Sequence, residues 1–352
     1  MQTRTNTSTE AKRQALLERL FPEGVPSLWC PLLTHYDESG RIEHARNEVH
    51  LRHLAPHVKG FLIPGSTSDG WELNHDEFWE LLEFALEQAQ SLKFDLLIGI
   101  LKADSREALE TLKQVQFHIR EATKEHDMTK ALEKVRVRGY AICAPRGKSV
   151  SQSEMERGLT AILKLGQPIA LYQLPQVTEN EMSAELIADL ADRFPNFIFF
   201  KDSSGADRVV QSGLEPGGVF MMRGAEGDYV RWLREAGGPY SGFLLSTANC
   251  FGAELVQMIS SANAGNFELA KDLSDRITGV IREAFDLVRP MQTGNIFTNA
   301  NKAIDHFFAH GQKEASPPRL HSGICLPPEI LRKTREILVR YGLMPSDGYM
   351  AK

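Results

Sequence analysis

The 352-residue sequence has few cysteines, and their spacing does not suit a metal or disulfide framework. Its four cysteines, Cys30, Cys143, Cys250 and Cys325, lie far apart and form no Cys-x-x-Cys pair. Zinc sites and small disulfide-based domains depend on more closely spaced cysteines. We therefore expect reduced, mostly buried thiols in a cytoplasmic protein.

An excess of positive charge and a long apolar segment are also missing. The 40 Lys and Arg residues against 46 Asp and Glu give a net charge of −6. Binding to nucleic acid needs clustered basic side chains that neutralise phosphates, so we expect no nucleic-acid partner. No apolar run approaches the span of a bilayer, and residues 1–13 are polar and lack the apolar region of a signal peptide. We therefore expect no membrane partner.

Two signatures of ligand-binding proteins are absent as well. The sequence has no Gly-x-Gly-x-x-Gly turn, which weighs against a doubly wound nucleotide-binding sheet. Its N-terminal histidines do not cluster at the ends of predicted strands, and three of them share the spacing of a solvated helical face. These histidines are His35, His44, His50, His53 and His57. We expect neither a metal ion nor a cofactor.

The sequence does contain eight short apolar segments that alternate with amphipathic helical patterns. The predicted strands are residues 27–34, 59–64, 95–100, 138–143, 168–172, 196–201, 219–223 and 240–246. Eight strands alternating with helices predict a single parallel (β/α)8 TIM barrel, which we assign to residues 26–264. A doubly wound sheet is the alternative fold.

Two segments flank the predicted barrel. Residues 1–25 are expected to form a flexible tail, to about residue 12, and a short helix at 15–20. Residues 265–352 predict a C-terminal helical extension, longer than one barrel crossover requires, that covers a barrel face or makes a subunit contact. The predicted helices after the last strand are 253–258, 267–288, 296–308 and 328–341. The charged stretch 121–134 has the character of an insertion.

The sixth predicted strand, within residues 196–205, ends in a single lysine. Strand alternation places Phe197, Phe199 and Lys201 on one face. Aromatic neighbours solvate a charged amine poorly, so we expect the pKa of Lys201 to be lowered. A neutral amine attacks a carbonyl to form a Schiff base. On this segment alone, a lysine that reaches into solvent is the more common arrangement.

Other polar residues lie where the predicted strands end, which is where TIM barrels carry their functional groups. Tyr172 and Lys201 end adjacent strands, so their side chains are expected to converge, and a tyrosine hydroxyl there could shuttle protons. Its alternative role is that of a core aromatic. The other candidates are Thr34, Ser66, Thr67, Ser68, Arg146, Lys148, Ser246 and Thr247. The turn at 65–67 suits a carboxylate, although these residue types also populate turns that bind nothing.

Several segments together resemble the dihydrodipicolinate synthase/N-acetylneuraminate lyase family of class I aldolases. The resemblance runs in register from about residue 26 to 264 and more loosely through the tail. It rests on Pro31-Leu32-Leu33-Thr34, Gly65-Ser66-Thr67-Ser68-Asp69, Leu171-Tyr172-Gln173-Leu174-Pro175, Phe200-Lys201-Asp202-Ser203-Ser204-Gly205 and Ser246-Thr247-Ala248-Asn249. Each segment is weak alone, whereas five in the right order are specific.

The resemblance implies a Schiff-base lyase or aldolase that acts on a 2-oxo acid and yields or uses pyruvate and an aldehyde, with dehydration as a further outcome. It implies that Lys201 forms the Schiff base, that Tyr172 moves protons, and that Ser66 and Thr67 hold the substrate carboxylate. Thr67 is included among the catalytic residues and Ser246 among the substrate-binding ones. It also implies a homo-oligomer, commonly a tetramer. The alternative is a non-catalytic member that binds a 2-oxo acid.

The chain departs from the family pattern at several of these places. Ser68 and Asp69 replace the usual Gly and Glu, and Arg146 and Gly147 stand where many members carry an aromatic pair. The segment 176–178 lacks the arginine with which the synthases hold an aldehyde substrate. We therefore do not expect dihydrodipicolinate synthesis itself.

Three charged or aromatic positions near the predicted site have two possible roles. Arg146 and Lys148 could meet an anionic distal end of the substrate, although ordinary solvated loop charges are the commoner arrangement. Trp71 and Glu72, just past the second-strand loop, could line the same mouth or pack beneath it.

Overall fold

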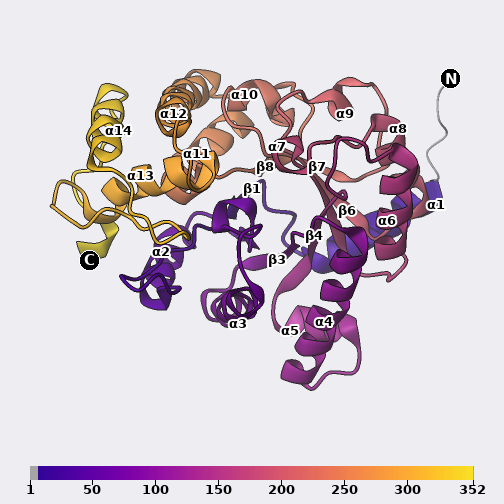
Figure 1. Cartoon of the computed structure of the whole chain (residues 1–352). Coiled ribbons are helices and arrows are strands. Elements are labelled where there is room, and N and C mark those ends of the chain that lie inside the picture. Colours follow the sequence, from indigo (N-terminus) through magenta and orange to yellow (C-terminus); the bar gives the residue numbers. More distant parts are fainter. Residues whose placement is uncertain (1–6, 352) are drawn as a thin grey trace. The chain divides into compact units, whose positions relative to one another are not determined.

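The computed structural model describes residues 7–351, and eight parallel strands form its central element (Figure 1). The strands are β1 (Leu28–Pro31), β2 (Gly60–Ile63), β3 (Asp95–Ile100), β4 (Val137–Cys143), β5 (Ile169–Gln173), β6 (Phe197–Asp202), β7 (Phe220–Arg223) and β8 (Gly242–Leu244). They join in chain order into a closed barrel. The predicted (β/α)8 TIM barrel with a C-terminal helical extension is confirmed. Within residues 7–351, no helix is both long and apolar enough to cross a membrane.

Helices connect and follow the strands. They are α1 (Thr7–Leu20), α2 (His44–Leu54), α3 (His75–Leu92), α4 (Ser105–Thr123), α5 (Met128–Lys134), α6 (Gln152–Leu163), α7 (Pro175–Thr178), α8 (Ala184–Arg193), α9 (Arg208–Gln211), α10 (Tyr229–Trp232), α11 (Ala248–Asn263), α12 (Phe267–Val288), α13 (Ile296–His310) and α14 (Pro328–Arg340). Three 3-10 turns are η1 (Ser66–Ser68), η2 (Arg234–Ala236) and η3 (Tyr349–Ala351). The start of α3 follows from the local sequence, because the side chain of the capping residue Asn74 accepts a hydrogen bond from the Glu77 N–H at 3.0 Å.

The chain divides into two compact units, which we describe separately. Unit 1 comprises the residues up to Ser27, Asp95–Ala225 and Pro239–Leu244, and it holds strands β3 to β8. Unit 2 comprises Leu28–Phe94, Glu226–Gly238 and the residues from Leu245 onward, and it holds β1, β2 and helices α10 to α14.

In unit 1, the charged stretch 121–134 continues the helical layer. Helix α4 runs to Thr123, Lys124 adopts a left-handed conformation (φ 57°), and Asp127 caps α5 by accepting from the Thr129 N–H at 2.8 Å. The Lys134 amine donates to the Thr123 carbonyl at 2.8 Å. Helices α4 and α5 therefore lie against one another (Figure 1).

The N-terminal segment is more ordered than its polar composition predicts. Helix α1 begins at Thr7, so the expected flexible tail is wrong for residues 7–12, and the rest of that prediction lies outside the described residues. Arg13 is fully buried and donates to the Phe197 carbonyl at 2.7 Å and to the Phe194 carbonyl at 3.0 Å. Further hydrogen bonds reach the carbonyls of Ala191 and Gly217. These long-range contacts leave no periodic signal in the sequence.

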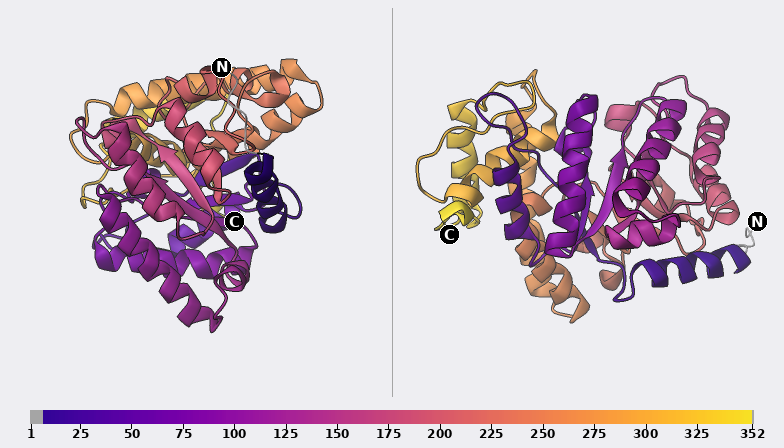
Figure 2. Two further views of the ribbon diagram at one scale, coloured as in Figure 1. Left: turned by 90° about the vertical axis from the view of Figure 1, so that its right-hand side faces the viewer. Right: turned by 90° about the horizontal axis from the view of Figure 1, so that it is seen from below.

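In unit 2, the helices that follow the barrel pack on one another. Helix α12 contacts α11, α13 and α14, and α13 contacts α14 (Figure 2). The four predicted C-terminal helices are all present, although α11 begins at Ala248, five residues before the predicted helix. Nearly every residue of α13 is buried, including polar ones. Its polar face therefore needs partners within the protein.

Several polar side chains of helix α13, or of the residue that caps it, contact the loop that follows β2. The Thr298 hydroxyl donates to the Thr67 carbonyl at 3.1 Å, and the Asn295 amide donates to the Ser66 carbonyl at 3.2 Å. One helical turn further on, the Lys302 amine lies 3.8 Å from a carboxylate oxygen of Asp69. The C-terminal extension thus holds η1 and the residue after it.

Lys302 is a lysine whose side chain is completely buried. Its side chain has 0% exposure, its amine donates to the Arg319 carbonyl at 2.8 Å, and the amine lies 4.5 Å from the centre of the Tyr36 ring. Burial lowers the pKa of Lys302 to about 8, and the charges of Asp69 and Asp305 oppose that change. Asp69 also accepts from the Tyr36 hydroxyl at 3.0 Å.

The lowered pKa of Lys302 predicts a pH-dependent stability. The folded protein releases this proton at about pH 8, whereas a lysine with the reference pKa of 10.5 in the unfolded chain keeps it longer. Between these values the unfolded chain binds more protons, so the contribution of Lys302 to the free energy of unfolding rises with pH. The rise is expected to be on the order of 3 kcal/mol in total.

Denaturant unfolding of the wild type and Lys302→Met at pH 7, 8, 9 and 10 measures this contribution. The difference in unfolding free energy, wild type minus variant, should increase steadily across the series. Lys333→Met, at an exposed position on α14, is measured in parallel to account for the loss of a lysine at the surface. A flat difference for Lys302→Met would show that its pKa is not lowered.

Candidate active site

Lys201 lies near the carboxyl end of β6, in unit 1. In the parallel ladder it is in register with Tyr172 on β5 and with Met222 on β7. Only 5% of Lys201 and 2% of Tyr172 are exposed. The predicted convergence of these two strand-end side chains therefore occurs within the barrel wall of unit 1.

The amine of Lys201 lies over the face of the tyrosine ring. Its nitrogen is 3.9 Å from the centre of the Tyr172 ring. The face of an aromatic ring attracts a cation, so this contact holds the amine in place. The sequence suggested Phe199 as a neighbour of the amine, but the Phe199 ring packs against those of Phe21 and Phe220, with centres 5.5 and 5.7 Å apart.

Two residues that the sequence analysis did not assign to the site shape the surroundings of Lys201. At Gly224, just after β7, an added Cβ would lie 2.7 Å from Lys201 Cε, so only glycine leaves the lysine its space. Cys143, at the end of β4, is in register with Tyr172. Burial raises the pKa of its thiol, with Lys201 acting in the opposite sense, so the thiol stays protonated and unreactive near neutral pH.

The residues that follow Lys201 are anchored by a buried ionic cluster. The Arg223 guanidinium donates to both carboxylate oxygens of Asp207, at 3.0 and 3.1 Å, and the Tyr240 hydroxyl donates to Asp207 at 2.7 Å. Burial, assisted by the charge of Asp207, raises the pKa of Asp202. The cluster joins β6, β7 and β8 just beyond the lysine and fixes the strand ends that carry it.

The predicted carboxylate-binding loop lies in unit 2, after β2. Ser66 and Thr67 are buried and begin the 3-10 turn η1. Two hydroxyls in a glycine-flanked turn are of the type that can hold a carboxylate. The Trp71 indole is partly buried and donates to the Ser66 hydroxyl at 2.9 Å, so it packs on the loop, whereas Glu72 is exposed.

Ser246, also in unit 2, follows β8 and serves a different partner from the expected one. Its hydroxyl donates to Glu226 at 2.7 Å. The same carboxylate accepts from the Thr247 hydroxyl at 2.6 Å and from the Tyr229 hydroxyl at 2.8 Å. The proton of Ser246 is thus engaged, and Glu226 is a strand-end group that was not among the predicted site residues.

Arg146 and Lys148 are exposed on the loop after β4. The backbone of this loop is held by the Asn180 amide, which donates to the carbonyls of Pro145 and Gly147 at 2.7 and 3.0 Å. The structure therefore joins Lys201 with Tyr172 in unit 1 and leaves the two loop cations in solvent. Ser66, Thr67 and Ser246 belong to unit 2.

Residues able to hold a metal ion come together in unit 2, although the sequence analysis predicted no metal. His35 and His50 meet, with Nε2 of the first 3.0 Å from Nδ1 of the second. Asp305 of α13 completes a buried set of three possible ligands. The two histidines are 15 positions apart in the sequence, and His35 lies outside the helix that carries His50. Helical periodicity therefore could not predict that they meet.

The proteins with similar sequences or folds include dihydrodipicolinate synthases and a sugar-acid aldolase. Over 267 residues, 75% of this chain and 84% of the relative, the sequence is 24% identical to a 4-hydroxy-tetrahydrodipicolinate synthase of Methanospirillum hungatei. The fold matches YagE, an Escherichia coli K12 prophage protein of the dihydrodipicolinic acid synthase family crystallised with pyruvate (TM-score 0.69, 18% identity, 90% of this chain and 99% of that one). It also matches a Sulfolobus solfataricus 2-keto-3-deoxygluconate aldolase variant in complex with L-2-keto, 3-deoxy-galactonate (TM-score 0.68, 16% identity, 90% and 96%).

The family assignment rests on a family profile rather than on a single relative. The profile of the Dihydrodipicolinate synthetase family matches residues 119–294, which is half of the chain and includes the tyrosine and lysine strands. This match, the barrel and the order of the strand-end segments agree. The chain belongs to the dihydrodipicolinate synthetase family.

Proposed function

We propose that the protein is a Schiff-base-forming lyase or aldolase that reversibly cleaves a 2-oxo acid to pyruvate and an aldehyde. The observation that carries this proposal is the buried Lys201 amine at the end of β6, 3.9 Å from the centre of the Tyr172 ring. A lysine is rarely buried without a role, and a strand end is the usual place for a catalytic group in this fold.

Lys201 supplies the nucleophile in the proposed reaction. The neutral amine adds to the ketone carbon of the 2-oxo acid, the ketone oxygen takes up a proton, and loss of water gives a protonated imine. The imine then accepts the electron pair of the breaking C3–C4 bond and becomes an enamine. Proton transfer from the 4-hydroxyl group releases the aldehyde. The enamine carbon C3 then takes up a proton, which restores the imine, and addition of water to the imine releases pyruvate and the free lysine amine.

Tyr172 carries the protons of this sequence. Its hydroxyl gives a proton to the departing ketone oxygen and takes one from the 4-hydroxyl group. Strand β5, which carries Tyr172, pairs with β4 on one side and β6 on the other, so its backbone holds the tyrosine beside Lys201. The nearby Cys143 remains protonated and does not compete with the amine.

Ser66 and Thr67 hold the substrate carboxylate in this proposal, with Thr67 the catalytic partner that the resemblance implies. The support is the N-terminal turn of η1, together with its anchoring by Thr298, Asn295 and the Lys302–Asp69 pair. Because the loop is already held in place, binding of a carboxylate does not cost the conformational entropy of ordering the loop. Ser246 acts here through Glu226 rather than as a direct donor.

The distal half of the substrate differs from that of the synthases. Position 146 is an arginine in place of an aromatic, and residues 176–178 contain no arginine. Exposed Arg146 and Lys148 are the proposed contacts for an anionic or hydroxylated distal end. These features favour a 2-oxo-3-deoxy sugar acid or a related 2-oxo acid. The homo-oligomeric state implied by the family stays a prediction.

The second candidate is a non-catalytic member that binds a 2-oxo acid. The replacement of the family's loop residues by Ser68 and Asp69 motivates it. Retention of both Lys201 and Tyr172 in contact favours the enzyme. The two candidates differ in whether a bound 2-oxo acid becomes covalently attached.

Reductive trapping tests the role of Lys201. Incubation with pyruvate and sodium borohydride is expected to leave one pyruvate-derived adduct per chain on Lys201, since borohydride reduces the imine to a stable amine. Peptide mass spectrometry locates the adduct. Lys201→Ala should show none, whereas Lys148→Ala, which removes an exposed amine, should be labelled like the wild type.

The same experiment decides between the two candidates. A wild type that binds pyruvate, by calorimetry, yet gives no adduct would favour the non-catalytic protein. An adduct on another lysine that survives in Lys201→Ala would contradict the proposed mechanism. Repeating the trapping from pH 6 to pH 10 measures the pKa at which the amine becomes nucleophilic.

The variant Tyr172→Phe separates binding from proton transfer. It keeps the ring on which the Lys201 amine lies and removes only the hydroxyl. We expect borohydride trapping to persist and kcat for pyruvate release to fall by about 100-fold or more. The assay screens 2-oxo-3-deoxy sugar acids and arylidene pyruvates, coupled to pyruvate reduction. Unchanged kcat on a substrate that the wild type cleaves would remove Tyr172 from the mechanism.

A further inference from the structure

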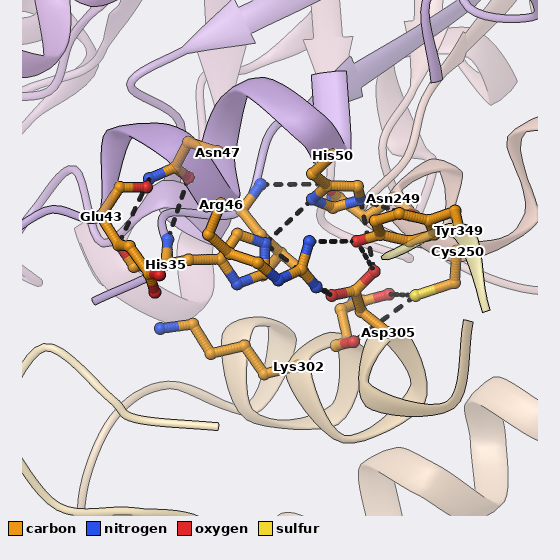
Figure 3. A network of polar contacts seen from close by, with 12 residues as sticks. His35, Glu43, Arg46, Asn47, His50, Asn249, Cys250, Lys302, Asp305 and Tyr349 are labelled. Carbon is orange, nitrogen blue, oxygen red and sulfur yellow. Dashed lines mark hydrogen bonds and ion pairs between the residues drawn. The ribbon is translucent and has the colours of Figure 1, made fainter. Parts of the chain in front are cut away.

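Unit 2 contains a polar cavity whose walls include none of the residues proposed for the aldolase chemistry. Its volume is about 820 Å³. His35 and Asp305 form part of the wall, together with Arg46, His306 and His310. The cavity therefore gives small solutes access to the edge of the buried cluster drawn in Figure 3.

The cluster brings three ligand-type groups together from three segments of the chain. His35 follows β1, His50 lies on α2 and Asp305 lies on α13 (Figure 3). His35 Nε2 is 3.0 Å from His50 Nδ1 and 3.8 Å from Asp305 Oδ2. A tetrahedral zinc ion with bonds of about 2.1 Å holds its ligand atoms about 3.4 Å apart, so this spacing suits a single ion.

Hydrogen bonding determines which histidine atoms carry lone pairs. His50 Nε2 faces two acceptors, the Asn249 carbonyl at 2.8 Å and Asp305 at 3.4 Å, so this nitrogen carries the hydrogen. The lone pair of His50 then lies on Nδ1, toward His35. An ion between the rings replaces their mutual hydrogen bond when His35 moves its hydrogen from Nε2 to Nδ1, and this shift releases no proton.

The two imidazoles are in the protonation state that a metal requires. Burial lowers the pKa of His35 well below its usual value, and the charge of Arg46 adds to this effect. Burial also lowers the pKa of His50, with Asp305 opposing and Arg46 assisting. Both rings are therefore neutral near pH 7, and no proton must leave before an ion binds.

Outer hydrogen bonds orient two of the three groups, His50 and Asp305, as they do in established metal sites. The His50 ring donates its second N–H to a backbone carbonyl, the usual arrangement for a ligating histidine. Asp305 accepts from the Tyr349 hydroxyl at 2.8 Å and from Arg46 at 2.5 Å. Oδ1 of Asp305 faces both Tyr349 and His50, whereas Oδ2 accepts from Arg46, lies 3.8 Å from His35 Nε2 and keeps a second lone pair for an ion.

Arg46 is the group that opposes a cation here. It neutralises Asp305, so the three ligands offer an incoming ion no net negative charge. The binding energy must then come mainly from the imidazoles, which favour zinc, iron, cobalt or nickel over magnesium or calcium. Removal of Arg46 should therefore tighten metal binding.

We propose that His35, His50 and Asp305 bind one divalent transition-metal ion, whose remaining coordination positions face the cavity. The site is separate from the aldolase chemistry and uses none of its residues. It ties the segment after β1 to α2 and α13, so an ion there joins parts of unit 2 that are far apart in the sequence.

Cobalt binding to the full chain, stripped of metal by chelation, tests this site. Equilibrium dialysis against Co²⁺ should give one ion per chain with visible d–d absorption, and Zn²⁺ should displace it. His35→Gln and His50→Gln should each weaken binding by at least roughly 100-fold, because each removes a ligand. Arg46→Met should tighten it about tenfold or more.

The matched control is the double variant His306→Gln/His310→Gln. These residues lie one turn apart on α13 and line the same cavity, so they form the competing histidine pair. The control should bind Co²⁺ like the wild type. Loss of binding in the control, or unchanged binding in His35→Gln, overturns the proposal.

A measurement on the wild type avoids dependence on variants that fail to fold. Imidazole nitrogen resonances followed by NMR during a Zn²⁺ titration should shift for two buried histidines, and circular dichroism confirms the fold throughout. Absence of Co²⁺ absorption and of these shifts in the folded wild type also overturns the proposal.

Discussion

The buried amine of Lys201 is the constraint on which the proposed chemistry depends. Lys201 as a whole is only 5% exposed, so its surroundings must replace much of the solvation that water would give the side chain. The structure provides the face of the Tyr172 ring on one side and leaves space at Gly224 on the other. The ionic cluster around Asp207 then holds the ends of the strands that carry these residues. Each of these features constrains the position of one nitrogen atom.

Two kinds of pattern made the fold predictable from the sequence. The barrel strands are short apolar runs with turn residues at their ends, and the C-terminal helices have clear amphipathic faces. Both patterns are local, so the eight strands and the helices from α11 to α14 appear where the sequence placed them, apart from shifts at their ends. Helix α1 was expected to begin later because its order depends on Arg13, whose four hydrogen bonds reach residues about 180 or more positions away.

Part of the candidate site was predictable because the functional residues of TIM barrels lie at the carboxyl ends of the strands. Lys201 and Tyr172 were named from position and chemistry, and adjacent strands bring them together. Gly224 was not named. It leaves room for the Lys201 side chain because it has no side chain of its own, and this role can be recognised only once the two residues are seen side by side. Glu226 and the meeting of His35 with His50 were missed for a related reason: their partners come from other segments, and no periodicity in the chain encodes such contacts.

Helix α13 has an unusual property for a segment outside the barrel: its interior-facing side is largely polar. Thr298 and Lys302 face the loop after β2, and Asp305, one turn further along the same side, faces the two histidines. A helix hardly stretches along its axis, because its backbone hydrogen bonds fix the rise per residue. The side chains of α13 that contact the loop and the histidine cluster are therefore held at a fixed spacing, and a shift of α13 along its axis would displace both sets of contacts together.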